Sequence, residues 1–251
     1  TSGISSPSDL WVPALKGLKP LRSDQWNVGF SYDWANKLMI SIEFYQKKLN
    51  CTTDYKNGAS LLTDLIPWYE KTTQGNGKAK GMEISIEKQS GRFTGAFYYT
   101  FARADRNYRD LNNGISFPFK YDRLHDLNTS LNIQLSKKVD VSVLWTFGTG
   151  YPVTIPYEKY FPALNLIDNI QFNMIYYYPS INNYRLQPYH RLDLGIHYKS
   201  QNKMGEHRLS LDLFNAYNHK NPVNMYFLQN YSFQQVYLLP FIPSLTYTLK
   251  F

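Results

Sequence analysis

The chain has 251 residues, of which 43% are hydrophobic, 17% aromatic and only 18% charged, with a net charge of +8. This composition excludes an intrinsically disordered chain, and the single cysteine, Cys51, excludes a disulfide framework and a cysteine-based structural zinc site. No run of about 18 apolar residues occurs, which excludes a transmembrane helix but leaves a membrane β-barrel open.

Nine segments alternate apolar and polar residues with a period of two, which predicts β-strands rather than helices. In the first segment, Trp26, Val28 and Phe30 alternate with Asn27 and Gly29. In chain order the alternating segments of the predicted strands cover residues 26–34, 38–44, 82–87, 93–101, 127–135, 139–147, 191–198, 208–213 and 244–251. Each strand therefore has one apolar and one polar face.

Short and long connections alternate between these strands. The short turns lie at residues 35–36, 90–91, 137–138 and 201–206, and the long loops at about 51–79, 104–123 and 151–186. Outer-membrane barrels have short periplasmic turns and long extracellular loops. The pattern therefore orients the sheet, with the short turns and the C-terminal Phe251 at the periplasmic rim.

The alternation leaves two all-β folds open, because an apolar strand face can pack against a second sheet or against lipid. A soluble β-sandwich is the commoner fold. Strands of about 10 to 14 residues and aromatic residues near strand ends, such as Trp26 and Trp34, favour an antiparallel transmembrane β-barrel. The last strand carries an alternating apolar run that we expect to act as an outer-membrane assembly signal: Leu245, Tyr247, Leu249 and Phe251.

Nine antiparallel strands do not close into a barrel, because the first and last would run parallel. We therefore expect an incomplete barrel whose remaining strands, with anything that fills the lumen, lie upstream or on another chain. The start of the chain, Thr1-Ser2-Gly3, has no initiator Met and no export signal, which also suggests a fragment.

Several short motifs occur along the chain in a characteristic order. They are Leu10-Trp11-Val12-Pro13, Gly75-Asn76-Gly77, Gly81-Met82-Glu83, Tyr121-Asp122-Arg123-Leu124-His125-Asp126-Leu127, Gly148-Thr149-Gly150-Tyr151-Pro152, Tyr189-His190-Arg191-Leu192-Asp193, Leu213-Phe214-Asn215-Ala216-Tyr217-Asn218 and the stretch from Pro243 to Phe251. Together they resemble the C-terminal barrel of TonB-dependent outer-membrane receptors of Gram-negative bacteria, in the branch with a carboxypeptidase-regulatory-like N-terminal domain.

The resemblance implies a 22-stranded barrel around a plug domain, of which residues 1–251 would supply the last nine strands, without the plug. It also implies the cell outer membrane as location, and partners comprising the lipid bilayer, the N-terminal barrel and plug, TonB with its inner-membrane motor, and a small-molecule or peptide ligand. The implied function is TonB-energised uptake of a scarce nutrient. A structural or adhesive barrel that partners other surface proteins without transport is the alternative.

Aromatic and amide side chains in two long loops are candidate ligand contacts. Tyr176, Tyr177 and Tyr178 belong to an aromatic run that begins at Met174 within the 151–186 loop, and the preceding loop contains Tyr108, Asn112 and Phe117. Such side chains often line ligand pockets. Packing of each loop on itself is the alternative interpretation.

The polar strand faces carry more acidic than basic residues. Glu83, Arg191, Asp193 and Asp212 are predicted to face the lumen. Buried charges need partners, so we expect them to pair with a plug or with one another; a cation-preferring lumen is the alternative.

No motif for catalysis, cofactor binding or nucleic-acid binding is present. The sequence lacks a nucleophile elbow, a phosphate-binding glycine loop and an HExxH motif, and its five histidines have no metal-binding spacing. We therefore expect neither an enzyme nor a metal or cofactor site. The positive charge predicts a solvated rim rather than a nucleic-acid surface, because many bases lie beside the short turns: Lys37, Lys88, Arg92, Lys137, Lys138, Lys199 and Lys203.

Overall fold

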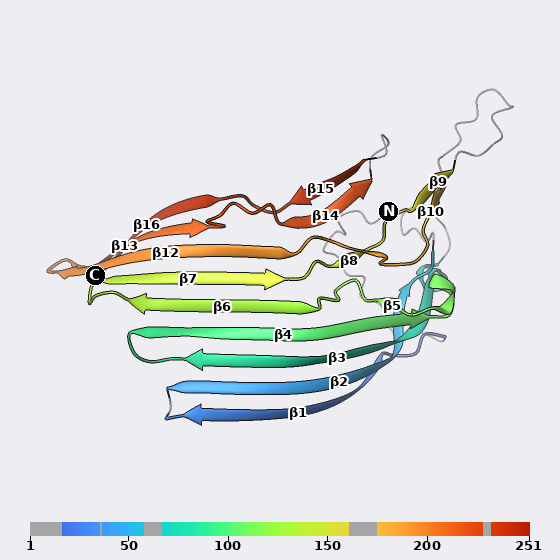
Figure 1. Cartoon of the computed structure of the whole chain (residues 1–251), viewed down its shortest axis with the longest axis horizontal. Helices are drawn as coiled ribbons and strands as arrows, with labels where there is room; N and C mark the ends of the chain where they lie inside the picture. The colour runs from blue at the N-terminus through green and yellow to red at the C-terminus, as the bar shows by residue number, and fades with distance from the viewer. Residues whose placement is uncertain (1–16, 36, 58–66, 161–174, 228–231) are drawn as a thin grey trace, which may run out of the picture.

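Nine long strands form one antiparallel sheet in the computed structural model, which describes residues 17–35, 37–57, 67–160, 175–227 and 232–251 (Figure 1). Each long strand corresponds to one of the nine segments predicted from the alternation, with β6 and β16 ending one residue earlier than predicted, so the expected all-β, antiparallel and incomplete barrel is confirmed. In spatial order they are β1 (Arg22–Trp34), β2 (Leu38–Tyr55), β3 (Thr72–Lys88), β4 (Phe93–Tyr108), β6 (His125–Gln134), β7 (Val139–Gly148), β12 (Tyr189–Asn202), β13 (Gly205–Phe214) and β16 (Ile242–Lys250).

The two faces of the sheet differ in both polarity and exposure. On the apolar face Ile196 is 46% exposed and Leu211 is 42% exposed, whereas their chain neighbours on the polar face, His197 and Ser210, are buried. Neighbouring side chains crowd together on the inside of a curved sheet and spread apart on the outside. The polar face is therefore the inner wall of the barrel, and the apolar face is the outer wall.

The ends of the sheet differ as predicted. The short turns that join β1 to β2, β3 to β4, β6 to β7 and β12 to β13 lie at one end with the C-terminus, and the long connections lie at the other (Figure 1). A fourth long connection, residues 215–241, was missed in the sequence. It contains the hairpin of β14 (Pro222–Phe227) and β15 (Phe233–Tyr237).

The predicted bounds of the first two long loops were wrong, because three strands continue beyond their alternating segments. Strand β2 extends to Tyr55, β3 begins at Thr72 and β4 extends to Tyr108. The pairing of β2 with β3 shifts at Cys51, which has a φ of 59° and forms a bulge. Beyond the apolar segments both strand faces are polar, so the alternation no longer reveals a strand.

Short strands also organise the long connections. Strand β5 (Phe117–Pro118) pairs with β4, β8 (Pro152–Val153) with β11 (Tyr184–Arg185), and β9 (Glu158–Tyr160) with β10 (Ile175–Tyr177). Two 3₁₀ turns, Trp68–Lys71 and Asn112–Gly114, complete the described elements. Within the described ranges no helix has the length and apolarity to cross a membrane. The predicted motif at residues 10–13, and Met174, lie outside the described residues.

Candidate functional site

The aromatic run of the third long loop lies on the β9–β10 hairpin. Tyr176 pairs with residue 159 and Tyr177 with Glu158 across the two strands. Tyr177 and Tyr178 are exposed, as are Tyr157 and Tyr160, which the sequence analysis did not single out. We call Tyr157, Tyr160, Tyr177 and Tyr178 the tyrosine hairpin.

Two phenols of the tyrosine hairpin are held in the neutral form. The Tyr160 hydroxyl donates a hydrogen bond to Glu158, and this bond raises the pKa of Tyr160. Partial burial raises the pKa of Tyr178, and the neighbouring Tyr176 adds to the effect. The hairpin therefore presents neutral aromatic rings and hydroxyl groups, which can stack on and hydrogen-bond to a ligand.

The candidate residues of the second long loop have structural partners instead. Tyr108 is 2% exposed and packs with Leu111 and Phe117 in a small core, against which Ile181 of the next loop lies. Asn112 accepts a hydrogen bond from the Ile181 amide at 3.1 Å and donates one to the Ile115 carbonyl at 3.0 Å. Tyr108 and Phe117 thus have no exposed ring in this arrangement, and the three residues join the two loops.

A buried ion pair provides a second link between the same loops. Nη2 of Arg185 lies 2.6 Å from Oδ2 of Asp122, and its Nη1 donates to the backbone carbonyls of Asp122 and Gly150, each at 2.9 Å. The other carboxylate oxygen of Asp122 accepts a hydrogen bond from the Ala104 amide at 2.6 Å. Arg185, near the end of the third long loop, therefore holds the end of the second long loop and the start of the third together, a link that no sequence pattern indicated.

A glycine near this ion pair, Gly148, leaves room for the side chain of Arg123. The Arg123 guanidinium occupies the space that a Cβ at Gly148 would need, and it lies 4.3 Å from the ring centre of Tyr151. Arg123 also pairs with Asp126 at 2.6 Å. The two sequence motifs, 121–127 and 148–152, thus form a single contact at the ends of β6 and β7.

The turn after β13 is fixed by one asparagine. Asn215 is fully buried and has a φ of 52°, a conformation that asparagine adopts more readily than most residues. The backbone N–H of Asn215 donates a hydrogen bond to the Asp193 carboxylate. Its side chain forms hydrogen bonds with the backbone of His219 and with the Leu239 carbonyl. The Asn215 motif therefore attaches the fourth long connection to β12 and β13.

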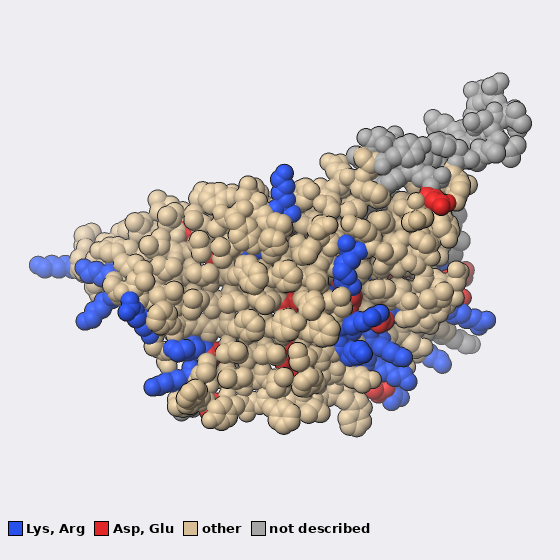
Figure 2. Space-filling view, in the orientation of Figure 1, with Lys and Arg blue, Asp and Glu red and all other residues tan. Residues whose placement is uncertain are grey.

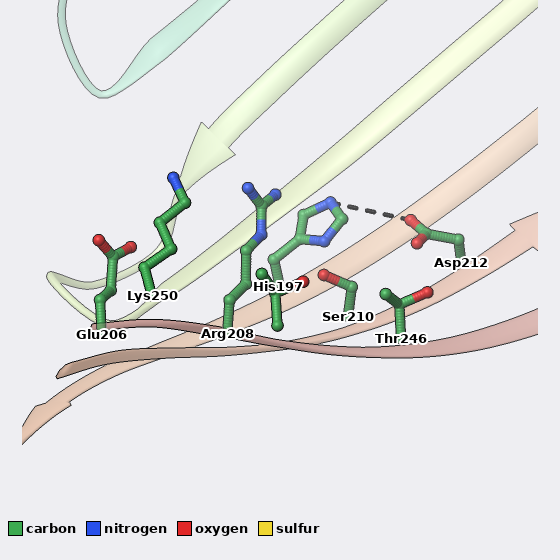
Figure 3. A pocket seen from close by; sticks show the side chains of 8 residues that line it. His197, Glu206, Arg208, Ser210, Asp212, Thr246 and Lys250 are labelled. Carbon is green, nitrogen blue, oxygen red and sulfur yellow. Dashed lines mark ion pairs between the residues drawn. The ribbon is translucent and has the colours of Figure 1, made fainter. Parts of the chain in front are cut away.

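Three of the four predicted lumen residues have ionisable neighbours on the inner wall. Asp193 pairs with Arg191 at 2.9 Å, and Arg191 stacks over Phe214 at 4.2 Å. Asp212 lies 3.8 Å from His197 (Figure 3). Glu83 faces Glu43 across β2 and β3 and forms no ion pair with a described residue. The inner wall thus contains both paired acidic side chains and an acidic side chain, Glu83, with no ion-pair partner among the described residues.

A shallow hollow of about 270 Å³ lies on the inner wall near the end of the sheet that carries the short turns. Figure 3 shows Glu206, Arg208 and Lys250 projecting from β13 and β16 beside His197 and Asp212. Charges of both signs line it, so it can receive a polar protein segment. Within the described residues no group of three or more histidine, cysteine or acidic side chains is arranged to hold a metal ion.

The fold of the chain is similar to that of two solved outer-membrane receptor structures. The chain has a TM-score of 0.62 and 13% identity with a ferric-catecholate import receptor, Fiu, from K12 E. coli, over 98% of this chain and 30% of that one. For the ferric citrate transporter FecA the TM-score is 0.59 and the identity 11%, over 91% and 31% of the two chains. The chain therefore spans about a third of these proteins. No curated protein matches it.

The sequence itself matches a family model. Residues 4–218 match the model described as "TonB dependent receptor-like, beta-barrel", which covers most of the nine-stranded sheet. The predicted resemblance and the predicted location in the outer membrane are thus confirmed. The chain belongs to the TonB-dependent receptor family and forms part of its outer-membrane β-barrel.

Proposed function

We propose that the chain forms part of the wall and several extracellular loops of a receptor for the TonB-energised uptake of a scarce nutrient. One observation carries the proposal: a curved sheet, apolar outside and charged inside, has its tyrosine hairpin at the long-loop end and ends in two edge strands, β1 and β16. Such a wall surrounds a hydrated lumen once further strands pair with its edges.

The proposal assigns residues 1–251 to the C-terminal part of a 22-stranded barrel, with the plug and remaining strands elsewhere in the gene product or on a separate chain. A plug in the lumen would contact the inner wall. The mixed charges of the hollow near Lys250, together with Glu83 and Glu43, which form no ion pair with a described residue, offer partners of both signs for it. TonB would then act through the plug.

Ligand contact is assigned to the tyrosine hairpin, because its rings are exposed whereas Tyr108 and Phe117 are buried. Asn112 and Tyr176 would support the loops beside it. Both structural neighbours are described as importing ferric chelates, so ferric catecholates and ferric citrate are the first probes. Cobalamin, peptides and sugars complete the panel.

The test uses the full-length gene as the only copy in a host with and without TonB. We expect growth on one probe to require both the gene and TonB, and to be lost when residues 157–180 are deleted while the amount of folded barrel is unchanged. Growth that is equal without TonB would contradict the proposal and favour a structural or adhesive barrel. Unchanged growth with the deletion would assign ligand binding elsewhere.

A further inference from the structure

Two histidine side chains stack face to face at the long-loop end of β12. The ring centres of His190, on β12, and His219, in the turn after β13, are 3.6 Å apart, and the ring planes differ by 22°. Both side chains are half-buried. His190 lies on the outer wall, two residues beyond Leu192, at the border of the apolar band. Figure 2 shows a broad band between the two ends of the molecule that contains few Lys and Arg atoms. The pair therefore lies where the wall leaves the bilayer and meets water.

These rings belong to a cluster that attaches the fourth long connection to the wall. Nδ1 of His190 lies 2.8 Å from the Tyr217 hydroxyl, and the backbone N–H of His190 donates a hydrogen bond to the Asn221 side chain at 2.8 Å. The Asn221 carbonyl accepts a hydrogen bond from the Leu238 amide, also at 2.8 Å. Asn221 precedes β14 and Leu238 follows β15, so the cluster holds the base of the β14–β15 hairpin. We call His190, Tyr217, His219 and Asn221 the histidine clasp.

No acidic side chain balances a positive charge on the stacked rings. On β7, Phe147 lies opposite His190 and carries no charge, and the segment 238–241 contains no ionisable residue. Asp193 already pairs with Arg191 at 2.9 Å. Among the described residues, no carboxylate lies within ion-pair distance of either ring. The other ionisable side chains around the pair are those of Tyr189, Arg191 and Asp193 on β12 and of Tyr217 and Lys220 in the turn.

We propose that the histidine clasp is an acid-sensitive attachment, which releases residues 216–221 from β12 when the surroundings become acidic. A histidine side chain ordinarily takes up a proton at about pH 6.5. Two imidazolium rings stacked at 3.6 Å repel each other, and no carboxylate offsets the repulsion. The closed clasp therefore accepts one proton and resists the second. Once residues 216–221 detach, the two rings separate and each binds a proton freely.

The direction of the pH dependence follows from the number of protons bound. At low pH the detached turn binds one proton more than the closed clasp, so the clasp is fully formed above about pH 6.5 and weakens as the pH falls. A difference of one proton changes the equilibrium about tenfold for each pH unit. Between pH 7.5 and pH 5.0, opening of the clasp should therefore become about 30-fold more frequent.

The test is amide hydrogen exchange of the full-length gene product in nanodiscs at about pH 7.5 and about pH 5.0, corrected for the intrinsic effect of pH on exchange. We expect the corrected rate to rise about 30-fold at the lower pH in peptides covering residues 216–222 and 236–240, and to stay constant in β1 and β2. The variant His219→Phe keeps a ring that can stack but cannot be protonated. Its rate should therefore rise by at most about threefold.

The matched control is His125→Phe. His125 also lies at the long-loop end of the outer wall, and its Nδ1 lies 2.8 Å from the Tyr99 hydroxyl, but no other described histidine stacks on its ring. This variant should keep the full response to pH. A wild type without the response, an equal response in His219→Phe, or loss of the response in His125→Phe would overturn the proposal.

A second measurement needs no variant. Hydrogen–deuterium exchange at the C2 carbon of each histidine reports the protonation of its ring, and it can be followed by mass spectrometry of the wild type. His190 and His219 together should take up about one proton between pH 7.5 and pH 5.0 while the clasp is closed. If His219→Phe does not assemble, this measurement decides, and uptake of two protons by the closed clasp would contradict the proposal.

Discussion

The ion pair between Asp122 and Arg185 should determine the local stability of the extracellular loops. The carboxylate side chain is 2% exposed, and the arginine side chain is 29% exposed. Arg185→Met removes three hydrogen bonds and leaves the carboxylate buried, with only the Ala104 amide as donor. Breaking a buried pair costs about 3–5 kcal/mol, and because water reaches Arg185 we expect about 2–4 kcal/mol.

The assay is amide hydrogen exchange of the full-length protein in nanodiscs. A loss of about 2–4 kcal/mol should speed exchange by about 30- to 1,000-fold in peptides covering residues 119–124, 149–153 and 184–188. Exchange in β1 and β2 should not change. In the double variant Asp122→Asn with Arg185→Met the buried charge is absent, so the combined loss should be smaller than the sum of the single losses.

The matched control is Arg22→Gln. Arg22 and Asp24 form an exposed pair, and such pairs contribute at most about 1 kcal/mol. Unchanged exchange in Arg185→Met, or an equal increase in Arg22→Gln, would refute the assignment of the buried pair as the link between the loops.

Three further predictions concern other parts of the molecule. Leu245→Lys places a charge on the outer wall of the edge strand β16 and should cost up to about 2–4 kcal/mol, so heat-modifiable barrel should disappear from the outer membrane; normal amounts would contradict lipid contact at this position. Asn215→Ala should destabilise the 215–241 connection by about 2–4 kcal/mol, measured by hydrogen exchange. Asn215→Gly should recover only the part of this loss that comes from the positive φ, because the side-chain hydrogen bonds stay absent. Full recovery by glycine would exclude a role for the side chain. Tyr177→Ala with Tyr178→Ala should weaken binding of the imported ligand about tenfold by isothermal titration, with folding intact; an unchanged Kd would remove the tyrosine hairpin from the site.

The nine long strands were predictable because lipid on one side and water on the other impose a strict alternation on each strand. The parts of β2, β3 and β4 beyond the apolar band were missed for the converse reason: residues such as Lys47 and Lys48 are polar on both faces there. The bulge at Cys51 also reverses the alternation. A strand that leaves the bilayer loses the pattern that identifies it.

The contacts between loops were not predictable from local patterns. Asp122 and Arg185 are 63 residues apart, and nothing in either segment indicates a partner. Tyr108 and Phe117 have the composition of a ligand site, but burial assigns them to packing.

The most direct test of the account is the environment of each residue along β13. Spin labels placed singly at residues 209, 210, 211 and 212 of the full-length protein, in a Cys51→Ser background and in nanodiscs, report collisions with oxygen and with a water-soluble nickel chelate. We predict a period of two: oxygen accessibility at Leu209 and Leu211, and nickel accessibility or immobilisation by a neighbouring chain at Ser210 and Asp212. Oxygen accessibility that is equal at all four positions, or greatest at Ser210 and Asp212, would contradict an outer wall in contact with lipid.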